Sequence, residues 1–162
     1  MVRSDKFLAG IVGAILLLVV VAVVVVLVRP DAEYRPEDSP ENVVHNYLLA
    51  LQLEDYERAY SYLSPELRHY PRTTADFVSD LSDNYWFRQT ASSSLTVNGA
   101  TISGDTAAVE VVEIRYHSGS LFGSSQSQDT YIVTVKRIDG QWRVADSAFY
   151  FAYCWNATYG CR

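Results

Sequence analysis

The sequence lacks the local motifs on which the commonest enzyme sites are built. It contains no G-x-S-x-G, no H-E-x-x-H, no P-loop and no G-x-G-x-x-G, which excludes a recognisable hydrolase elbow, zinc protease helix or nucleotide-binding loop. Histidine is scarce too: His45, His69 and His117 stand far apart, with no second ligand at helical spacing. We therefore expect no enzyme, no catalytic residue, no cofactor and no metal site.

Cysteine is represented by only two residues, Cys154 and Cys161, both near the C-terminus. A domain of about 120 residues can bury roughly two-thirds of its unfolded surface, so it does not depend on a disulfide framework. In an oxidising compartment a pair this close predicts a disulfide that closes the tail 154–162. Metal binding and two free thiols are the alternatives, although no histidine lies close enough in sequence to complete a metal site.

Basic residues are few beyond the N-terminal segment. From residue 30 onward the chain has 18 acidic residues against 10 basic ones. An acidic surface repels phosphate backbones and anionic lipid headgroups. We therefore expect no nucleic acid among the partners of this part.

Polar side chains are absent from residues 7–28, a run of 22. With ~1.5 Å of rise per residue, such a helix would reach roughly 33 Å and cross a hydrocarbon core of ~30 Å. A cleaved signal peptide has a shorter apolar region that ends in a small-residue cleavage site. We therefore predict an uncleaved transmembrane helix whose partner is the lipid bilayer.

The charges flanking this run predict its orientation. Arg3 and Lys6 precede it, and only Arg29 follows it closely. Positive charge stays inside, so the tail 1–6 is expected in the cytoplasm and the rest of the chain outside the cell membrane. Small residues four positions apart in the run leave a homodimer through this helix as an open alternative.

A linker and several helices are predicted next. Residues 29–38 combine prolines with acidic residues, a composition typical of an extended linker. Ser39 is then a strong N-cap and Pro40 suits the first helical position. An apolar stripe at helical spacing continues to Leu51. Further start signals lie at Asp55, at Ser64 with Pro65, and at Thr73 or Thr74.

After residue 87 the apolar period changes from 3.6 to 2, which indicates strands. Gly104 with Asp105 and Asp139 with Gly140 suit tight hairpin turns. A bulge near Val111 would place the apolar residues on either side of it on one face of the sheet. The predicted strands are residues 93–102, 106–116, 127–138 and 141–152.

Three segments resemble the nuclear transport factor 2-like superfamily, also called the cystatin-like fold. They are SPENVVHNYLLALQLEDYERAYSYLSPELR at 39–68, ISGDTAAVEV at 102–111 and VKRIDGQWRVAD at 135–146. The resemblance implies an α+β domain over residues 39–153, with helices packed in a cone formed by a curved four-strand antiparallel sheet. Within the superfamily, the sequence resembles most the bacterial, membrane-anchored, extracytoplasmic members without assigned activity.

The cone has four candidate pocket residues: Tyr47, Trp86, Tyr131 and Asp146. Asp146 is the one ionisable residue in phase with the apolar positions of the last strand, so it would sit among aromatic rings if that face is concave. A bulge that shifts the phase would leave it exposed. The bulky side chains of the long helix and the central strands predict a narrow or closed pocket.

These observations favour a membrane-anchored extracytoplasmic domain of binding or interaction type, whose ligand is unknown. With the cone closed, binding would use the outer face of the sheet and the loop 118–127. One alternative is an accessory subunit of a secretion or transport assembly. The other is a small-molecule isomerase, dehydratase or hydrolase that uses the cone pocket, with Asp146 as general base.

Overall fold

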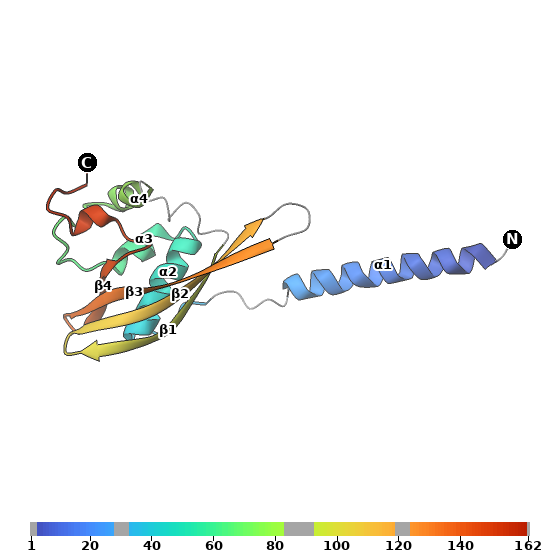
Figure 1. Ribbon diagram of the computed structural model, residues 1–162, viewed down its shortest axis with the longest axis horizontal. Helices are drawn as coiled ribbons and strands as arrows, with labels where there is room; N and C mark the ends of the chain where they lie inside the picture. Colours follow the sequence, from blue (N-terminus) through green and yellow to red (C-terminus); the bar gives the residue numbers. More distant parts are fainter. Residues whose placement is uncertain (1–2, 28–32, 83–92, 119–123, 162) are drawn as a thin grey trace. The chain divides into compact units, whose positions relative to one another are not determined.

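The computed structural model describes residues 3–27, 33–82, 93–118 and 124–161 (Figure 1). The chain divides into two compact units, residues 1–33 and residues 34–162. Within the described residues, the first unit holds helix α1 and the second holds the later helices and the strands.

Helix α1 (Arg3–Leu27) covers most of the apolar run. The expected helical conformation of this run is confirmed, and the side chains of residues 10–22 are exposed. Within the described part of the chain, no helix is both long and apolar enough to cross a membrane. The transmembrane assignment of residues 7–28 therefore stays a prediction.

Helix α2 (Pro40–Gln52) begins at the residues that predict it. The hydroxyl of Ser39 accepts a hydrogen bond from Asn42 N at 3.2 Å, and Pro40 opens the helix. This cap satisfies one N–H group that has no partner within the helix. The buried apolar positions of α2 form the centre of the core: Val43, Val44, Tyr47, Leu48, Leu49, Ala50 and Leu51.

Two shorter helices follow, each capped as expected. Asp55 accepts from Arg58 N at the start of α3 (Tyr56–Ser61). Thr73 accepts from Asp76 N at the start of α4 (Thr74–Ser82). Between them, the start signal at Ser64 gives only a single turn.

The four strands form one antiparallel meander in the order β1-β2-β3-β4. They are β1 (Ser93–Ser103), β2 (Thr106–Ser118), β3 (Ser124–Ile138) and β4 (Gln141–Ser147). Gly104, Asp139 and Gly140 have positive φ, as tight hairpin turns between twisted strands require. Figure 1 shows α2 against one face of this curved sheet, so the predicted α+β arrangement is confirmed.

The last strand is shorter than the predicted 141–152. Beyond Ser147 the chain leaves the sheet, because the hydroxyl of Ser147 bonds the backbone of Phe149 and closes a local turn. Tyr150 then has φ 57°, a conformation that no strand can contain. The turn carries Tyr150 into the core, where its side chain is buried.

The predicted bulge near Val111 is wrong. The pairing of β2 with β3 runs in unbroken register through Val111. The bulges lie instead in β1, where Asn98 is the extra residue, and in β4, where Ala145 is. Because β2 is regular, its odd-numbered positions continue to face the helices beyond Val111.

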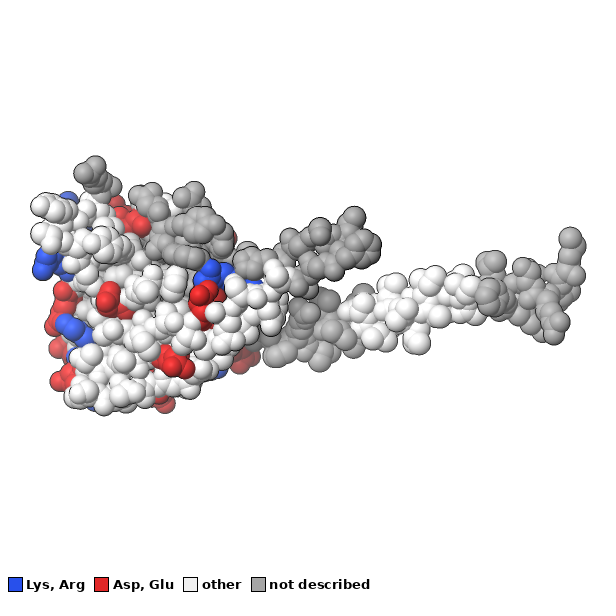
Figure 2. All heavy atoms as spheres, viewed as in Figure 1, with Lys and Arg blue, Asp and Glu red and all other residues white. Residues whose placement is uncertain are grey.

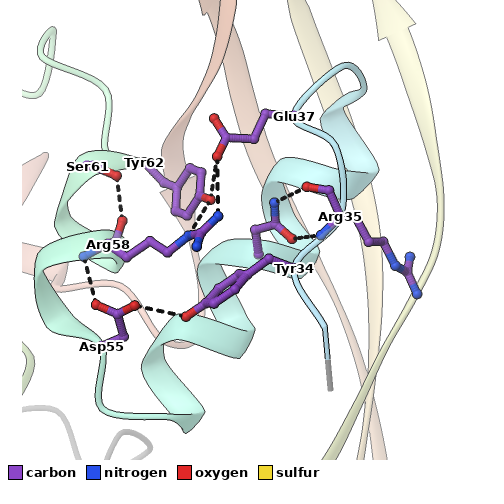
Figure 3. A network of polar contacts seen from close by, with 8 residues as sticks. Tyr34, Arg35, Glu37, Asp55, Arg58, Ser61 and Tyr62 are labelled. Carbon is purple, nitrogen blue, oxygen red and sulfur yellow. Dashed lines mark hydrogen bonds and ion pairs between the residues drawn. The ribbon is translucent and has the colours of Figure 1, made fainter. Parts of the chain in front are cut away.

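Residues 34–38 form a strap that is bound to the helices of the second unit (Figure 3). The buried amide of Asn46 bonds both backbone groups of Arg35, accepting from N at 2.7 Å and donating to O at 2.8 Å. Tyr34 donates to Asp55 Oδ2 at 3.1 Å. The predicted linker extended to residue 38, whereas the compact unit begins at Tyr34.

Candidate functional site

Two charged residues lie inside the cone, on the inward face of β2. Apolar residues fill the inward positions of this strand up to Val111, and the next two inward positions carry Glu113 and Arg115. Glu113 is 2% exposed and Arg115 is 7% exposed. Burial of ionised groups is costly unless they are paired, so the contacts of these two side chains matter.

Glu113 and Arg115 form an ion pair that extends to the surface. Arg115 Nη2 lies 2.7 Å from Asp129 Oδ2 and 3.2 Å from Glu113 Oε2. The shorter contact is a hydrogen bond to a half-exposed carboxylate. The contact with Glu113 lies outside hydrogen-bond geometry, and Glu113 Oε2 has no hydrogen-bond partner among the described residues. The cluster thus combines two acidic side chains with one basic side chain.

Aromatic side chains enclose the carboxylate of Glu113. Tyr150 donates to Glu113 Oε1 at 2.5 Å, and Tyr47 donates to the backbone oxygen of Tyr150. The ring of Tyr131 lies 4.9 Å from that of Phe149 and 6.4 Å from that of Tyr150. The Arg115 guanidinium lies 5.9 Å from the centre of the Phe149 ring, a cation–π distance.

The hydroxyl of Tyr131 has no hydrogen-bond partner among the described residues, although it is buried. Burial raises the pKa of Tyr131, and the neighbouring Tyr150 and Glu113 act in the same direction. Burial and the hydrogen bond to Glu113 raise the pKa of Tyr150 as well. Both hydroxyls therefore stay protonated at neutral pH and can donate.

The structure brings together two of the four predicted pocket residues. Tyr47 and Tyr131 both lie at this cluster, whereas Trp86 falls outside the described residues. Glu113 and Arg115 were missed because the expected bulge at Val111 would have turned both outward. Strict alternation along β2, carried on past Val111, is the signal that would have found them.

Asp146 does not reach the interior. The bulge at Ala145 shifts the phase of β4 by one residue, so Asp146 is exposed. It lines a hollow of about 540 Å³ together with residues of the C-terminal tail. Asn156 Nδ2 lies 3.4 Å from its carboxylate. Of the two alternatives for Asp146, the exposed one is correct.

The predicted disulfide between Cys154 and Cys161 is present. The carboxylate of Asp80 lies close to both sulfur atoms, with all ligand atoms of the group within 4.8 Å of one another. Thiolates, not disulfide sulfurs, bind metal ions. The oxidised pair is therefore no metal site.

No protein-family model matches the chain, and no curated protein matches it. Among solved structures, a SEC-C motif containing protein from Rhodopseudomonas palustris is similar at a TM-score of 0.50 and 18% identity, over 72% of this chain and 83% of its own. An NTF-2 like protein of unknown function from Shewanella oneidensis is similar at a TM-score of 0.43 and 11% identity, over 64% of this chain and 93% of its own. An NTF2-like protein with a cystatin-like fold from Novosphingobium aromaticivorans is similar at a TM-score of 0.44 and 16% identity, over 64% of this chain and 73% of its own. Similarity at these identities concerns the fold alone, and the second and third of these proteins are NTF2-like in name.

Proposed function

We propose that this chain is a membrane-anchored domain that binds a small ligand outside the cytoplasm and catalyses no reaction. The buried pair of Glu113 and Arg115 is the observation that supports the binding role most strongly. A buried ion pair adds little or no net stability compared with apolar residues of similar volume. A position where the sequence departs from the rules of core packing is commonly a functional one.

The free hydrogen-bonding atoms of the cluster define what the ligand must offer. Glu113 Oε2 is an acceptor and Tyr131 Oη a donor, and neither has a hydrogen-bond partner in the described part of the domain. The rings of Tyr131, Phe149 and Tyr150 supply apolar surface beside them. The ligand is therefore small, with a flat or apolar body and both a donor and an acceptor.

Two tyrosine variants test the binding role. We expect Tyr131→Phe to leave stability unchanged or raise it by about 1 kcal/mol, because it removes a buried hydroxyl that bonds no described residue. Tyr150→Phe should cost about 1–3 kcal/mol, because Glu113 loses its donor. Thermal unfolding of the full-length protein in one detergent measures both.

Native mass spectrometry of the same preparations supplies the functional readout. Wild-type protein purified from its own membrane should carry a small-molecule adduct that both tyrosine variants lose. Wild-type protein without any adduct would count against the binding role. So would a Tyr131→Phe variant that loses as much stability as Tyr150→Phe, because its hydroxyl would then have a structural partner.

The membrane anchor of this proposal is residues 7–28, with Arg3 and Lys6 on the cytoplasmic side. Acidic side chains are spread over the face of the second unit seen in Figure 2. Such a surface favours a position away from anionic headgroups. Protease added to intact cells should degrade residues 34–162 and spare a cytoplasmic control protein. Full protection would reverse the proposed orientation.

A second candidate is acid–base catalysis, with Glu113 in place of the exposed Asp146. The carboxylate of Glu113 lies beside the protonated hydroxyls of Tyr131 and Tyr150, which could stabilise negative charge that develops on a substrate oxygen. Isomerisation of a small carbonyl compound that disappears in Glu113→Gln would favour the enzyme. Ligand binding without turnover favours the binding domain.

A further inference from the structure

A second hollow lies apart from the Glu113 cluster, between residues 67–72 and helix α4. Its volume is about 680 Å³, and Gly160 and Cys161 of the tail also line it. Ligand sites commonly enclose about 300–1,000 Å³. Figure 1 shows the C-terminal tail running beside α4, which is the arrangement that produces this hollow.

The tail that lines this hollow is fixed to its surroundings. Trp155 is fully buried, donates from Nε1 to Asp80 Oδ2 at 2.7 Å and accepts from His69 N at 2.9 Å. Its ring stacks on that of Phe77, with centroids 5.5 Å apart. The disulfide then holds Cys161 to Cys154. A site bounded by such a wall is formed before a ligand arrives, which lowers the entropic cost of binding.

Gly160 shows how closely the tail approaches residues 67–72. A Cβ at this position would lie 2.7 Å from His69 Nδ1, so the backbone rests against the imidazole ring. The other ring nitrogen, Nε2, is buried and has no hydrogen-bond partner among the described residues. The wall thus contains one polar ring atom with unused hydrogen-bonding capacity.

Charges of opposite sign line the two sides of the hollow. Arg68 and Arg72 belong to one side, and Asp76 and Asp80 of α4 to the other. Asp80 already accepts the hydrogen bond from Trp155 Nε1. Arg68, Arg72 and Asp76 form no ion pair with another described residue, in contrast to Lys136 with Glu66 on the same unit. The two arginines and Asp76 do not neutralise each other, so each can pair with a charged group of a ligand.

From these observations we infer that the hollow binds a small zwitterion, with a carboxylate at Arg68 and Arg72 and an ammonium group at Asp76. A free amino acid or a short peptide has this chemistry. Two arginines present planar donor pairs that suit a carboxylate. This site shares no residue with the Glu113 cluster, so the inference stands independently of the proposed function.

The test uses isotope-labelled full-length protein in detergent and four probes. They are γ-aminobutyrate and ε-aminocaproate, which carry both charges, and butyrate and butylamine, which carry one each. We expect saturable amide shifts in residues 67–72 with at least one zwitterion at millimolar concentration. Each singly charged probe should bind about tenfold more weakly, because it loses one charge-assisted contact.

Three variants assign the charges. Arg68→Gln with Arg72→Gln should weaken zwitterion and butyrate binding by about tenfold or more, and Asp76→Asn should remove the preference for the zwitterion over butyrate. Lys136→Gln, which removes a cation elsewhere, is the matched control and should change nothing. Equal affinity for all four probes would overturn the inference. So would the absence of saturable shifts, or binding that the arginine variants leave intact.

Discussion

Arg115→Met should destabilise the second unit by about 3–5 kcal/mol, because the carboxylate of Glu113 would remain buried without its cation. Glu113→Leu should cost less, since Arg115 keeps its 2.7 Å contact with the half-exposed Asp129. The double variant should return to within about 1 kcal/mol of wild type, because two apolar side chains refill the same space.

Denaturant unfolding of the full-length protein, in one detergent throughout, measures this cycle. Lys136→Met is the matched control: its ion pair with Glu66 has a similar length, 3.1 Å, but both side chains are about half exposed. It should cost less than about 1 kcal/mol. A double variant as unstable as Arg115→Met would mean that the charges are needed for folding, which would remove the main support for a ligand site.

Local signals predicted most of the secondary structure, because those signals act within a few residues. Ser39, Asp55 and Thr73 each bond an N–H group three residues on, so a cap can be identified without knowledge of the fold. The same holds for the hairpin turn at Asp139 and Gly140, where positive φ is needed on both residues.

The interior could not be predicted in the same way, because the position of a bulge depends on the partner strand. An apolar pattern that changes parity at Val111 has two explanations. Either a bulge keeps the apolar side chains on the inward face, or the strand stays regular and the inward face changes from apolar to charged side chains. The sequence around Val111 contains no residue that decides between them. The actual bulges at Asn98 and Ala145 follow from pairing across the sheet, and the second of them turns Asp146 outward.

The contacts of the strap could not be predicted from its composition. Residues 29–38 have the prolines and acids of a solvated linker, yet Arg58 stacks its guanidinium 3.5 Å from the centre of the Tyr34 ring and pairs with Glu37. These partners are more than 20 residues away in sequence, so their pairing cannot be read from a local window. A buried asparagine in the apolar stripe of α2 was the available signal, since a buried amide needs bonding partners.

Asn46→Ala should release this strap and lower the free energy of unfolding by about 2–4 kcal/mol. The side chain of Asn46 is fully buried and satisfies both backbone groups of Arg35. Alanine would leave these groups without partners and a gap in the core. The more exposed contacts of Tyr34, Glu37 and Asp38 would then be left to hold the strap.

Hydrogen exchange at the amide of Arg35 is the direct measure of that release, and denaturant unfolding gives its energy. We expect exchange at this amide to become as fast as global unfolding of the variant, or faster, because its acceptor is gone. Asn42→Ala is the matched control: its side chain bonds Asp38 at 3.0 Å on the exposed side of the same strap. That change should stay within about 0.5 kcal/mol. Equal effects of the two asparagine variants would show that the strap is held by its surface contacts, and that Asn46 has no special role in joining residues 34–38 to the domain.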